Sequence, residues 1–456
     1  VLETYPFYVA PDSASYHGEI PARPADARVT MTFCENPVWE VVTALPGLLK
    51  DEAMTAPDAA EAIFSACVAE GILRDNPAIA TELHRWLTSD RSDSTLVSML
   101  SRNSDLKTFV LSATPWVQAA ESDTERMTRL ALLFDRKTID NAIDANLTLL
   151  KKLQMPSGAF RWMQQSDYPS QWATSRVLCL LGSLGEMGHL PKDKRVQPMI
   201  KSALEWLDTE VVKDYRRYPD GDFSSWTYLH TFYPKASTTA SARRVINATV
   251  QRLVSGWKDE DVPGKAKAAI ILNANGYSST ASQVLKSLRE YSVYSPERGM
   301  HWPSLDNLGF FSAYTKVSAT AFALDAFRTV EPGCADIDRI RQWLILQKEA
   351  QDWGNSTATT ATVAAILNSS RRFIKPARGA VITVGGHEIE PDAFQRAPGS
   401  LRSDITAFTP AVGTDFDVVR PGDAPSWGSV YIQYIGEMAG VKASSCDDIS
   451  IEKQLY

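Results

Sequence analysis

The chain has 456 residues, of which 44% are hydrophobic and 22% charged, and its formal net charge is −7. This length predicts about two or three domains and a core large enough to need no covalent staples. The acidic balance argues against nucleic acid as a partner, because no basic excess exists to neutralise phosphates. No run of about 18 apolar residues occurs, so no direct membrane span is predicted.

The first thirty-odd residues have the pattern of β structure. Thr4–Val9 is typical of a strand, and Val29–Phe33 alternates apolar and polar residues as a half-buried strand does, after a loop that holds Pro21 and Pro24. Because Val1 lies just ahead of a strand, we interpret the chain as a piece of a longer protein. Its first residues therefore give no information on the cellular compartment.

From Asn36 the hydrophobic period becomes helical. Asn36 and Pro37 have the residue types of an N-cap and a first helical position. In Thr138–Leu153 the apolar residues recur at steps of three and four, which places them on one helix face. Similar spacing predicts helices at 58–72, 124–135, 169–187, 196–208, 239–256, 263–274, 280–291, 313–330, 336–349 and 356–368.

A tryptophan-containing phrase recurs between the predicted helices. It is Ser-Gly-Ala-Phe-Arg-Trp at Trp162, Arg-Gly-Met-His-Trp at Trp302 and Gln-Asp-Trp-Gly at Trp353, with a looser relative at Asp222–Trp226. We interpret each as a turn. Recurrence every 50–80 residues indicates stacked helix pairs closing into an α/α toroid. The alternative is an unrelated helical bundle whose tryptophans serve only as core residues.

After about Arg371 the period returns to two. Ala380–Val384, Gly385–Gly386 and His387–Ile389 predict a strand, a tight turn and a second strand. Further strands are predicted at 404–408, 415–419 and 429–435. The order β, α, β predicts one β domain, formed by segments 1–35 and 371–448, that is interrupted by a helical insertion at 36–370.

Five phrases in a shared order resemble the thioester-domain region of alpha-2-macroglobulins, in particular the bacterial, Bacteroidetes-type members. They are Asn36–Pro46, Leu130–Asp135, Lys152–Phe160, Trp343–Lys348 continued by Gln351–Trp353 and Thr359–Ala361, and Ser426–Tyr434. The resemblance implies an α/α toroid inserted in, or flanked by, a β-sandwich domain. It also implies that residues 449–456 begin a following domain.

The family's chemistry depends on a Cys-x-Glu-Gln motif, in which the cysteine sulfur and the glutamine carbonyl form an internal thioester. The stretch here that resembles it carries Ala59, Glu61 and Ala62, followed by Phe64. Alanine has neither a thiol nor a carboxamide, so these are vestigial thioester positions. Cys67 is two helical turns away from Ala59 and has no glutamine in the required place. We expect Glu61 in the first turn of a helix, near the positive end of its dipole.

The resemblance implies a non-enzymatic module of a protein that binds or traps proteases without a covalent tether. The expected partners are proteases, reached through the parent protein, and other domains of the same parent chain. The expected location is periplasmic or anchored to the cell envelope. No cofactor and no catalytic residue are expected.

The main alternative is a carbohydrate-active or other small-molecule enzyme that uses the toroid cavity. Trp162, Trp226, Trp302 and Trp353 could be sugar platforms, and Asp167, Asp222 and Asp352 lie close to three of them. A deep groove lined by two opposed carboxylates would favour this alternative.

Metal sites are not predicted from the cysteines and histidines. The five cysteines are far apart and show no CxxC spacing: Cys34, Cys67, Cys179, Cys334 and Cys446. This argues against a disulfide framework and structural zinc. We expect most of them to be buried small hydrophobes. Cys334-Ala-Asp336 comes nearest to a zinc-binding phrase but lacks a partner histidine, and His301 is more typical of a structural residue.

Overall fold

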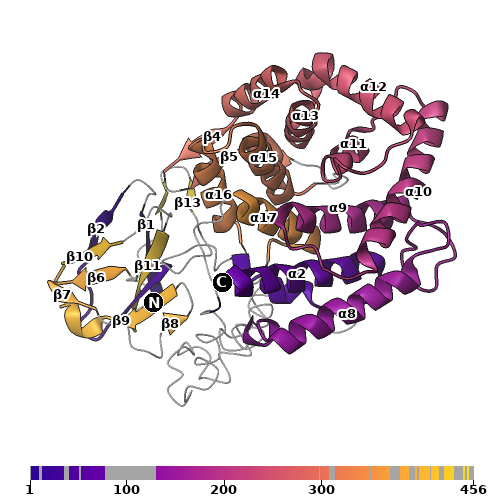
Figure 1. Ribbon diagram of the computed structural model, residues 1–456. Coiled ribbons are helices and arrows are strands. Elements are labelled where there is room, and N and C mark those ends of the chain that lie inside the picture. Colours follow the sequence, from indigo (N-terminus) through magenta and orange to yellow (C-terminus); the bar gives the residue numbers. More distant parts are fainter. Residues whose placement is uncertain are drawn as a thin grey trace, which may run out of the picture. The chain divides into compact units, whose positions relative to one another are not determined.

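The computed structural model describes residues 2–9, 13–34, 41–50, 53–75, 77, 130–296, 298–307, 314–348, 352–369, 380–389, 396–397, 400–410, 412–420, 426–435, 445–446 and 449–450 (Figure 1). The chain divides into two compact units. The β unit combines Val1–Pro37 with Ala377–Tyr456, and the helical unit is Val38–Pro376. The predicted fold class, mainly α with a helical ring inserted in β structure, is confirmed. The predicted helix start at Asn36–Pro37 lies outside the described residues.

The β unit consists chiefly of two antiparallel sheets. In the larger sheet the order is β1 (Leu2–Val9), β11 (Ser426–Gln433), β3 (Arg28–Cys34), β9 (Ser400–Asp404) and β8 (Arg396–Ala397). In the smaller it is β2 (Ser15–Ile20), β10 (Thr414–Val419), β6 (Val381–Val384) and β7 (His387–Glu388). A short ladder joins β12 (Ser445–Cys446) to β13 (Ile449–Ser450). Strands from both ends of the sequence therefore share each of the two main sheets.

Alternating side chains of the two main sheets form one core. In β10 the buried residues are Thr414, Phe416 and Val418, and the intervening residues are exposed. The Phe7 ring from the larger sheet lies 5.1 Å, centroid to centroid, from that of Phe416 in the smaller. Val430 from the larger sheet and Ile382 from the smaller belong to the same buried cluster. The shared core makes this unit a β-sandwich.

One predicted strand in the β unit is wrong, and one predicted turn is confirmed. The strand expected at 404–408 ends at Asp404, and Thr406–Phe408 forms a 3-10 turn. The Asp404 carboxylate accepts hydrogen bonds from the backbone N–H and the hydroxyl of Thr406, which bends the chain at that point. Gly385 and Gly386 have φ angles of 56° and 79°, and they form the expected tight turn between β6 and β7.

The helical unit is a ring of inner helices with a second set of helices packed outside it (Figure 1). Successive inner helices contact each other, and the last contacts the first. They are α2 (Ala56–Asp75), α9 (Gln171–Met187), α11 (Ser224–Thr231), α13 (Val262–Ala274), α15 (Lys316–Val330) and α17 (Ser356–Ser369). The outer helices are α8 (Arg136–Leu153), α10 (Val196–Arg217), α12 (Ala240–Gly256), α14 (Ser278–Glu290) and α16 (Asp336–Leu346).

The sequences of the two sets explain which set lies inside. The outer helix α14 buries one stripe, Ala281, Val284, Leu285 and Leu288, as an amphipathic helix does. The inner helix α13 buries every residue from Ala266 to Leu272, so it is covered on all sides over that stretch. Small residues in the inner helices let their backbones approach closely. Short elements complete the unit: η1 (Leu45–Leu48), η2 (Trp257–Asp259), η3 (Pro303–Asn307), and the hairpin of β4 (Val293–Ser295) and β5 (Gly299–His301).

The helical unit departs from the sequence-based expectation in two places. The Asp222–Trp226 phrase, predicted as a turn, leads into the short helix α11, because the Asp222 carboxylate accepts the backbone N–H of Ser224 and starts the helix. Helix α10 continues to Arg217, beyond the predicted end at residue 208. Most of the predicted helix at 124–135 lies outside the described residues. No helix among the described residues is long and apolar enough to cross a membrane.

Candidate functional site

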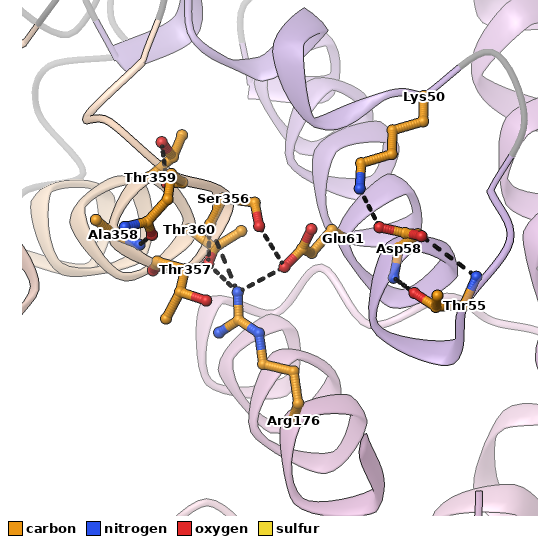
Figure 2. Close-up of polar contacts among 11 residues, drawn as sticks. Lys50, Thr55, Asp58, Glu61, Arg176, Ser356, Thr357, Ala358, Thr359 and Thr360 are labelled. Carbon is orange, nitrogen blue, oxygen red and sulfur yellow. Dashed lines mark hydrogen bonds and ion pairs between the residues drawn. The ribbon is translucent and has the colours of Figure 1, made fainter. Parts of the chain in front are cut away.

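The segment that carries Ala59, Glu61 and Ala62 lies at the start of α2, on the inner ring. Figure 2 shows Thr55, Asp58 and Glu61 at this end of the helix. Thr55 and Asp58 form a reciprocal cap there. The Thr55 hydroxyl accepts the Asp58 backbone N–H, and the Asp58 carboxylate accepts the Thr55 backbone N–H, both at 3.2 Å. The Asp58 carboxylate also pairs with Lys50. Ala56 N–H donates to the Trp162 carbonyl at 2.9 Å, which fixes where the helix begins.

The pKa of Asp58 reflects this arrangement. Burial acts to raise it, but the hydrogen bonds from Lys50 and Thr55 and the charge of Lys50 outweigh burial, so the pKa lies below its usual value. The carboxylate is therefore ionised at neutral pH and acts as a structural anchor for the first turn.

Ala59 and Ala62 are buried side chains in the packed interior. Their exposed fractions are 0% and 1%, and their neighbours Ile63 and Phe64 are at 0%. One turn further on, the Ser65 hydroxyl donates to the Leu45 carbonyl at 2.7 Å and joins α2 to the preceding η1. The segment is thus held on both sides, and methyl groups occupy the two positions where a thiol and a carboxamide would be needed.

Glu61 lies in the second turn of α2, so the expectation of a first-turn position near the helix dipole is wrong. The helix begins at Ala56, earlier than predicted, and only Asp58 is an acidic residue of its first turn. The Glu61 carboxylate accepts hydrogen bonds from Arg176 Nη2 and Ser356 Oγ, each at 2.9 Å. Arg176 Nη2 also donates to Thr360 Oγ1 at 2.6 Å (Figure 2). Glu61 therefore links α2 to α9 and α17.

Arg176 and Ser356 were not predicted as partners of Glu61. They lie 115 and 295 residues away in the sequence. A signal existed for Arg176, which is the one charged residue between Gln171 and Leu184. A lone charge within a helical stretch that is mostly buried indicates a buried partner. Ser356 carries no comparable signal, because serine is common at helix starts.

Cys67 is unsuited to replace the missing thiol. It is 1% exposed, and burial raises the pKa of its thiol far above the usual value, with a smaller contribution from the charge of Glu70. A thiol with such a pKa stays protonated and is a poor nucleophile. Cys34 and Cys67 are buried, as expected for small hydrophobic residues, and Cys179 and Cys334 are partly buried.

The recurring tryptophans are mostly internal anchors. Trp302 is 0% and Trp353 2% exposed. Their indole N–H groups donate to the Leu288 and Leu344 carbonyls, in the last turns of α14 and α16, at 2.8 and 2.6 Å. Each tryptophan thus donates to a carbonyl in the last turn of a helix, and the Leu344 carbonyl also accepts the Gln347 backbone N–H at 3.3 Å.

Trp226 and Trp162 differ from that pair. Trp226 is 7% exposed, and its N–H donates to the Asp208 carboxylate at 3.1 Å. Trp162 is exposed and packs against Trp172, with ring centroids 4.8 Å apart and ring planes tilted by 34°. Of the four proposed sugar platforms, only Trp162 presents an open face.

The other candidates are occupied by structural contacts. His301 stacks on Trp343, and its pKa is lowered by burial first and by the charge of Lys316 second. Asp336, two residues after Cys334 in the phrase nearest to a zinc site, pairs with Arg289 at 2.6 Å and Arg339 at 3.1 Å. The described residues contain no group of three or more acidic, histidine or cysteine side chains placed to hold a metal ion.

By fold, the chain is a ring of paired helices inserted into a β-sandwich. No protein-family model matches it, and no curated protein does. Its structure is similar to those of bacterial alpha-2-macroglobulins. A native form from Escherichia coli, spanning domain MG7 to the C-terminus, has 12% identity and a TM-score of 0.46, covering 94% of this chain and 56% of that one.

Two further solved structures are of the same kind. Salmonella alpha-2-macroglobulin reacted with methylamine has 11% identity and a TM-score of 0.47, covering 94% of this chain and 23% of that one. The Escherichia coli protein activated by porcine elastase has 12% identity and a TM-score of 0.45, covering 94% and 32% respectively. The chain thus spans between about a quarter and little more than half of the length of these proteins.

Proposed function

We propose that the chain is a non-enzymatic module of an alpha-2-macroglobulin-like protein that encloses proteases without a covalent tether. The absence of a covalent tether is supported by Ala59 and Ala62, which lie on either side of Glu61 in the first two turns of α2. The relation to alpha-2-macroglobulins is supported by the five sequence phrases in their shared order, together with a helical ring inserted in a β-sandwich.

The proposal extends to the division of the chain and to its location. Residues 1–35 and 371–448 would be one β domain, 36–370 the domain related to thioester domains, and 449–456 the first part of a following domain. The parent protein would be periplasmic or anchored to the cell envelope, and its other domains would supply the remaining contacts with the protease.

The packing around Ala59 and Ala62 explains how the segment could keep its structure after losing the ability to form a thioester. A thioester requires a thiolate, a carboxamide and a turn that brings them together. The alanines supply neither group, yet their methyls fill the interior. The Thr55–Asp58 cap and the Glu61–Arg176 pair keep the local backbone in place. We propose that the site has become a structural part of the ring.

Treatment with methylamine followed by peptide mass mapping tests the loss of the thioester. Methylamine opens a thioester by forming an amide at the glutamine side chain and releasing the cysteine thiol. We expect no mass gain in residues 55–70 and no new thiol. An adduct mapped to this segment would overturn the proposal. Ala59→Cys combined with Ala62→Gln is the matched positive variant, and Ala59→Cys alone is its control because it lacks the acyl acceptor.

Enclosure can be measured on the full-length parent with porcine elastase as the probe protease. An enclosed protease remains accessible to a short peptide substrate but not to a large protein substrate. We expect the cleavage of the large substrate to fall while that of the short peptide persists, and the protease to separate from the parent under denaturing conditions. Equal loss of both activities would indicate a blocked active site and would refute enclosure.

The carbohydrate-active alternative gains no support from the described residues. Trp226, Trp302 and Trp353 are buried, and their indole N–H groups are bound. Asp222 is bonded to Arg252 at 2.7 Å, and Asp352 accepts the Gly354 backbone N–H at 2.7 Å. Each of these two carboxylates is therefore engaged in a structural contact, Asp222 at the start of α11 and Asp352 in the turn before α17.

A further inference from the structure

A buried lysine lies in the inner ring, away from the α2 segment. Lys267 of α13 is 6% exposed. Its ammonium donates to the Ser225 hydroxyl at 3.0 Å and to the Tyr314 hydroxyl. It also lies over the rings of Tyr314 and Phe322, 4.7 and 5.2 Å from their centroids. Three inner helices, or the residues just before them, thus converge on one cationic group.

Nothing in the described part of the chain neutralises this charge by direct contact. None of the ion pairs between described residues includes Lys267. Taking an ammonium out of water costs several kcal/mol, and aromatic faces and neutral hydroxyls offset only a part of that. Most buried cations are paired with a carboxylate. A buried lysine held by hydroxyls alone therefore leaves a charge that an anion could complement.

Asp222 is the nearest candidate for an internal counterion, but it makes no direct contact with Lys267 among the described residues, and one of its oxygens is engaged by Ser224 and Arg252. Burial raises its pKa, but hydrogen bonds from Ser224 and the charges of Arg252 and Lys267 outweigh burial and lower it. One Asp222 oxygen accepts the Ser224 backbone N–H at 2.9 Å and Arg252 Nη2 at 2.7 Å. Its side chain is 62% exposed, so solvent screens its effect on Lys267.

Ser225 supplies the route from Lys267 to solvent. It is exposed, although the lysine that bonds to it is buried. Because the Ser225 oxygen accepts a hydrogen bond from Lys267, its own O–H is directed elsewhere and can donate to a ligand. Ser225 is also the second residue of α11, in the turn where backbone N–H groups have no acceptor within the helix.

We propose that Lys267 and Ser225 form a binding site for a small oxyanion, a carboxylate or a phosphate group, at the start of α11. Lys267 supplies the charge and a third N–H donor, Ser225 supplies a neutral donor, and the first turn of α11 adds its positive end. The site is independent of the thioester question, because none of its residues belongs to the α2 segment.

Thermal unfolding of the whole chain in sodium phosphate, acetate and chloride at matched ionic strength tests the site. Binding to the folded state alone raises the unfolding midpoint as anion concentration increases. Salt exclusion from the surface raises it in every variant alike. We expect an additional rise with phosphate or acetate in the native chain and in Lys286→Met, which removes an exposed lysine of α14. We expect none in Lys267→Met.

Calorimetric titration with inorganic phosphate and with acetate gives the affinity directly. Ser225→Ala should weaken binding about tenfold, the value of one hydrogen bond to a charged group. Binding of phosphate alone, of acetate alone or of both supports the site and identifies the group that it prefers. Equal midpoint shifts in the native chain and Lys267→Met, or no heat with either anion, would overturn it. Should Lys267→Met fail to fold, Ser225→Ala against Lys286→Met decides.

Discussion

Replacing Arg176 with methionine would remove the cationic partner of a buried carboxylate. The side chains of Glu61 and Arg176 are 5% and 13% exposed, so water screens their interaction poorly. Without Arg176, the Glu61 carboxylate keeps the hydrogen bond from Ser356 among its described contacts. Breaking a buried ion pair by removing one partner costs about 3–5 kcal/mol. We expect Arg176→Met to lower the apparent free energy of unfolding of the helical unit by that amount.

Urea denaturation followed by far-ultraviolet circular dichroism measures this effect. Every described α-helix belongs to Val38–Pro376, so the helical signal reports on that unit. Lys201→Met is the matched control, because it breaks an exposed pair with Glu205 at 3.9 Å and should cost less than about 0.5 kcal/mol. The double variant Glu61→Met with Arg176→Met removes both charges and should recover most of the stability, since neither charge is left unpaired.

Two results would refute this reasoning. A loss below about 1 kcal/mol for Arg176→Met would mean that Glu61 is solvated or neutralised without its partner. A double variant as unstable as the sum of the two single variants would mean that packing, and not charge pairing, is the source of the effect.

Three further predictions concern groups whose pKa values are shifted. Asp58→Ala should cost about 0.5–2 kcal/mol through loss of the cap on α2, measured by urea denaturation. Because the folded pKa of Asp58 lies below 3.8, its contribution should be present above that pH and be lost as pH falls further. Burial raises the pKa of Glu186 above 4.5 despite the opposing charge of Arg328. The contribution of Glu186 to the free energy of unfolding should therefore be lost as pH rises above that value. Glu186→Gln should make the free energy of unfolding less dependent on pH in that range. Cys67 should resist thiol reagents in the folded chain and react after denaturation. Peptide mass mapping measures this, and labelling of Cys67 in the folded chain would contradict the prediction.

Local pattern was sufficient to predict most elements. Helix α8 follows from apolar residues at steps of three and four, and β10 from strict alternation. Helix α11 was missed because its eight residues are too few to show a period, and because Asp222 is as typical of a turn as of a helix start. The same ambiguity at Asp404 led to a strand being predicted where a side-chain hydrogen bond bends the backbone.

In the candidate site too, the sequence predicted the positions of residues within an element but not their partners from distant elements. Ala59, Glu61 and Ala62 were placed on a helix from the sequence, and the structure locates them in α2. The partners of Glu61 depend on how the ring closes, which brings α9 and α17 against α2. No local pattern contains that information. Lys267 is similar, since its position in an apolar run indicates an unusual contact but does not identify Ser225 or Tyr314 as the groups that it meets.

The order of strands in the larger sheet has a consequence for biosynthesis. Strand β11 lies between β1 and β3, so these two N-terminal strands cannot complete their pairing until residues 426–433 have been made. The helical unit is synthesised in the interval, and most of its helices pack against helices that are near in the sequence, so it should fold first. At about 5–20 residues per second, residues 35–433 take roughly 20–80 s to synthesise. For that time β1 and β3 present unpaired edges and apolar side chains such as Phe7 and Phe33, and a chaperone would protect them most effectively in this period.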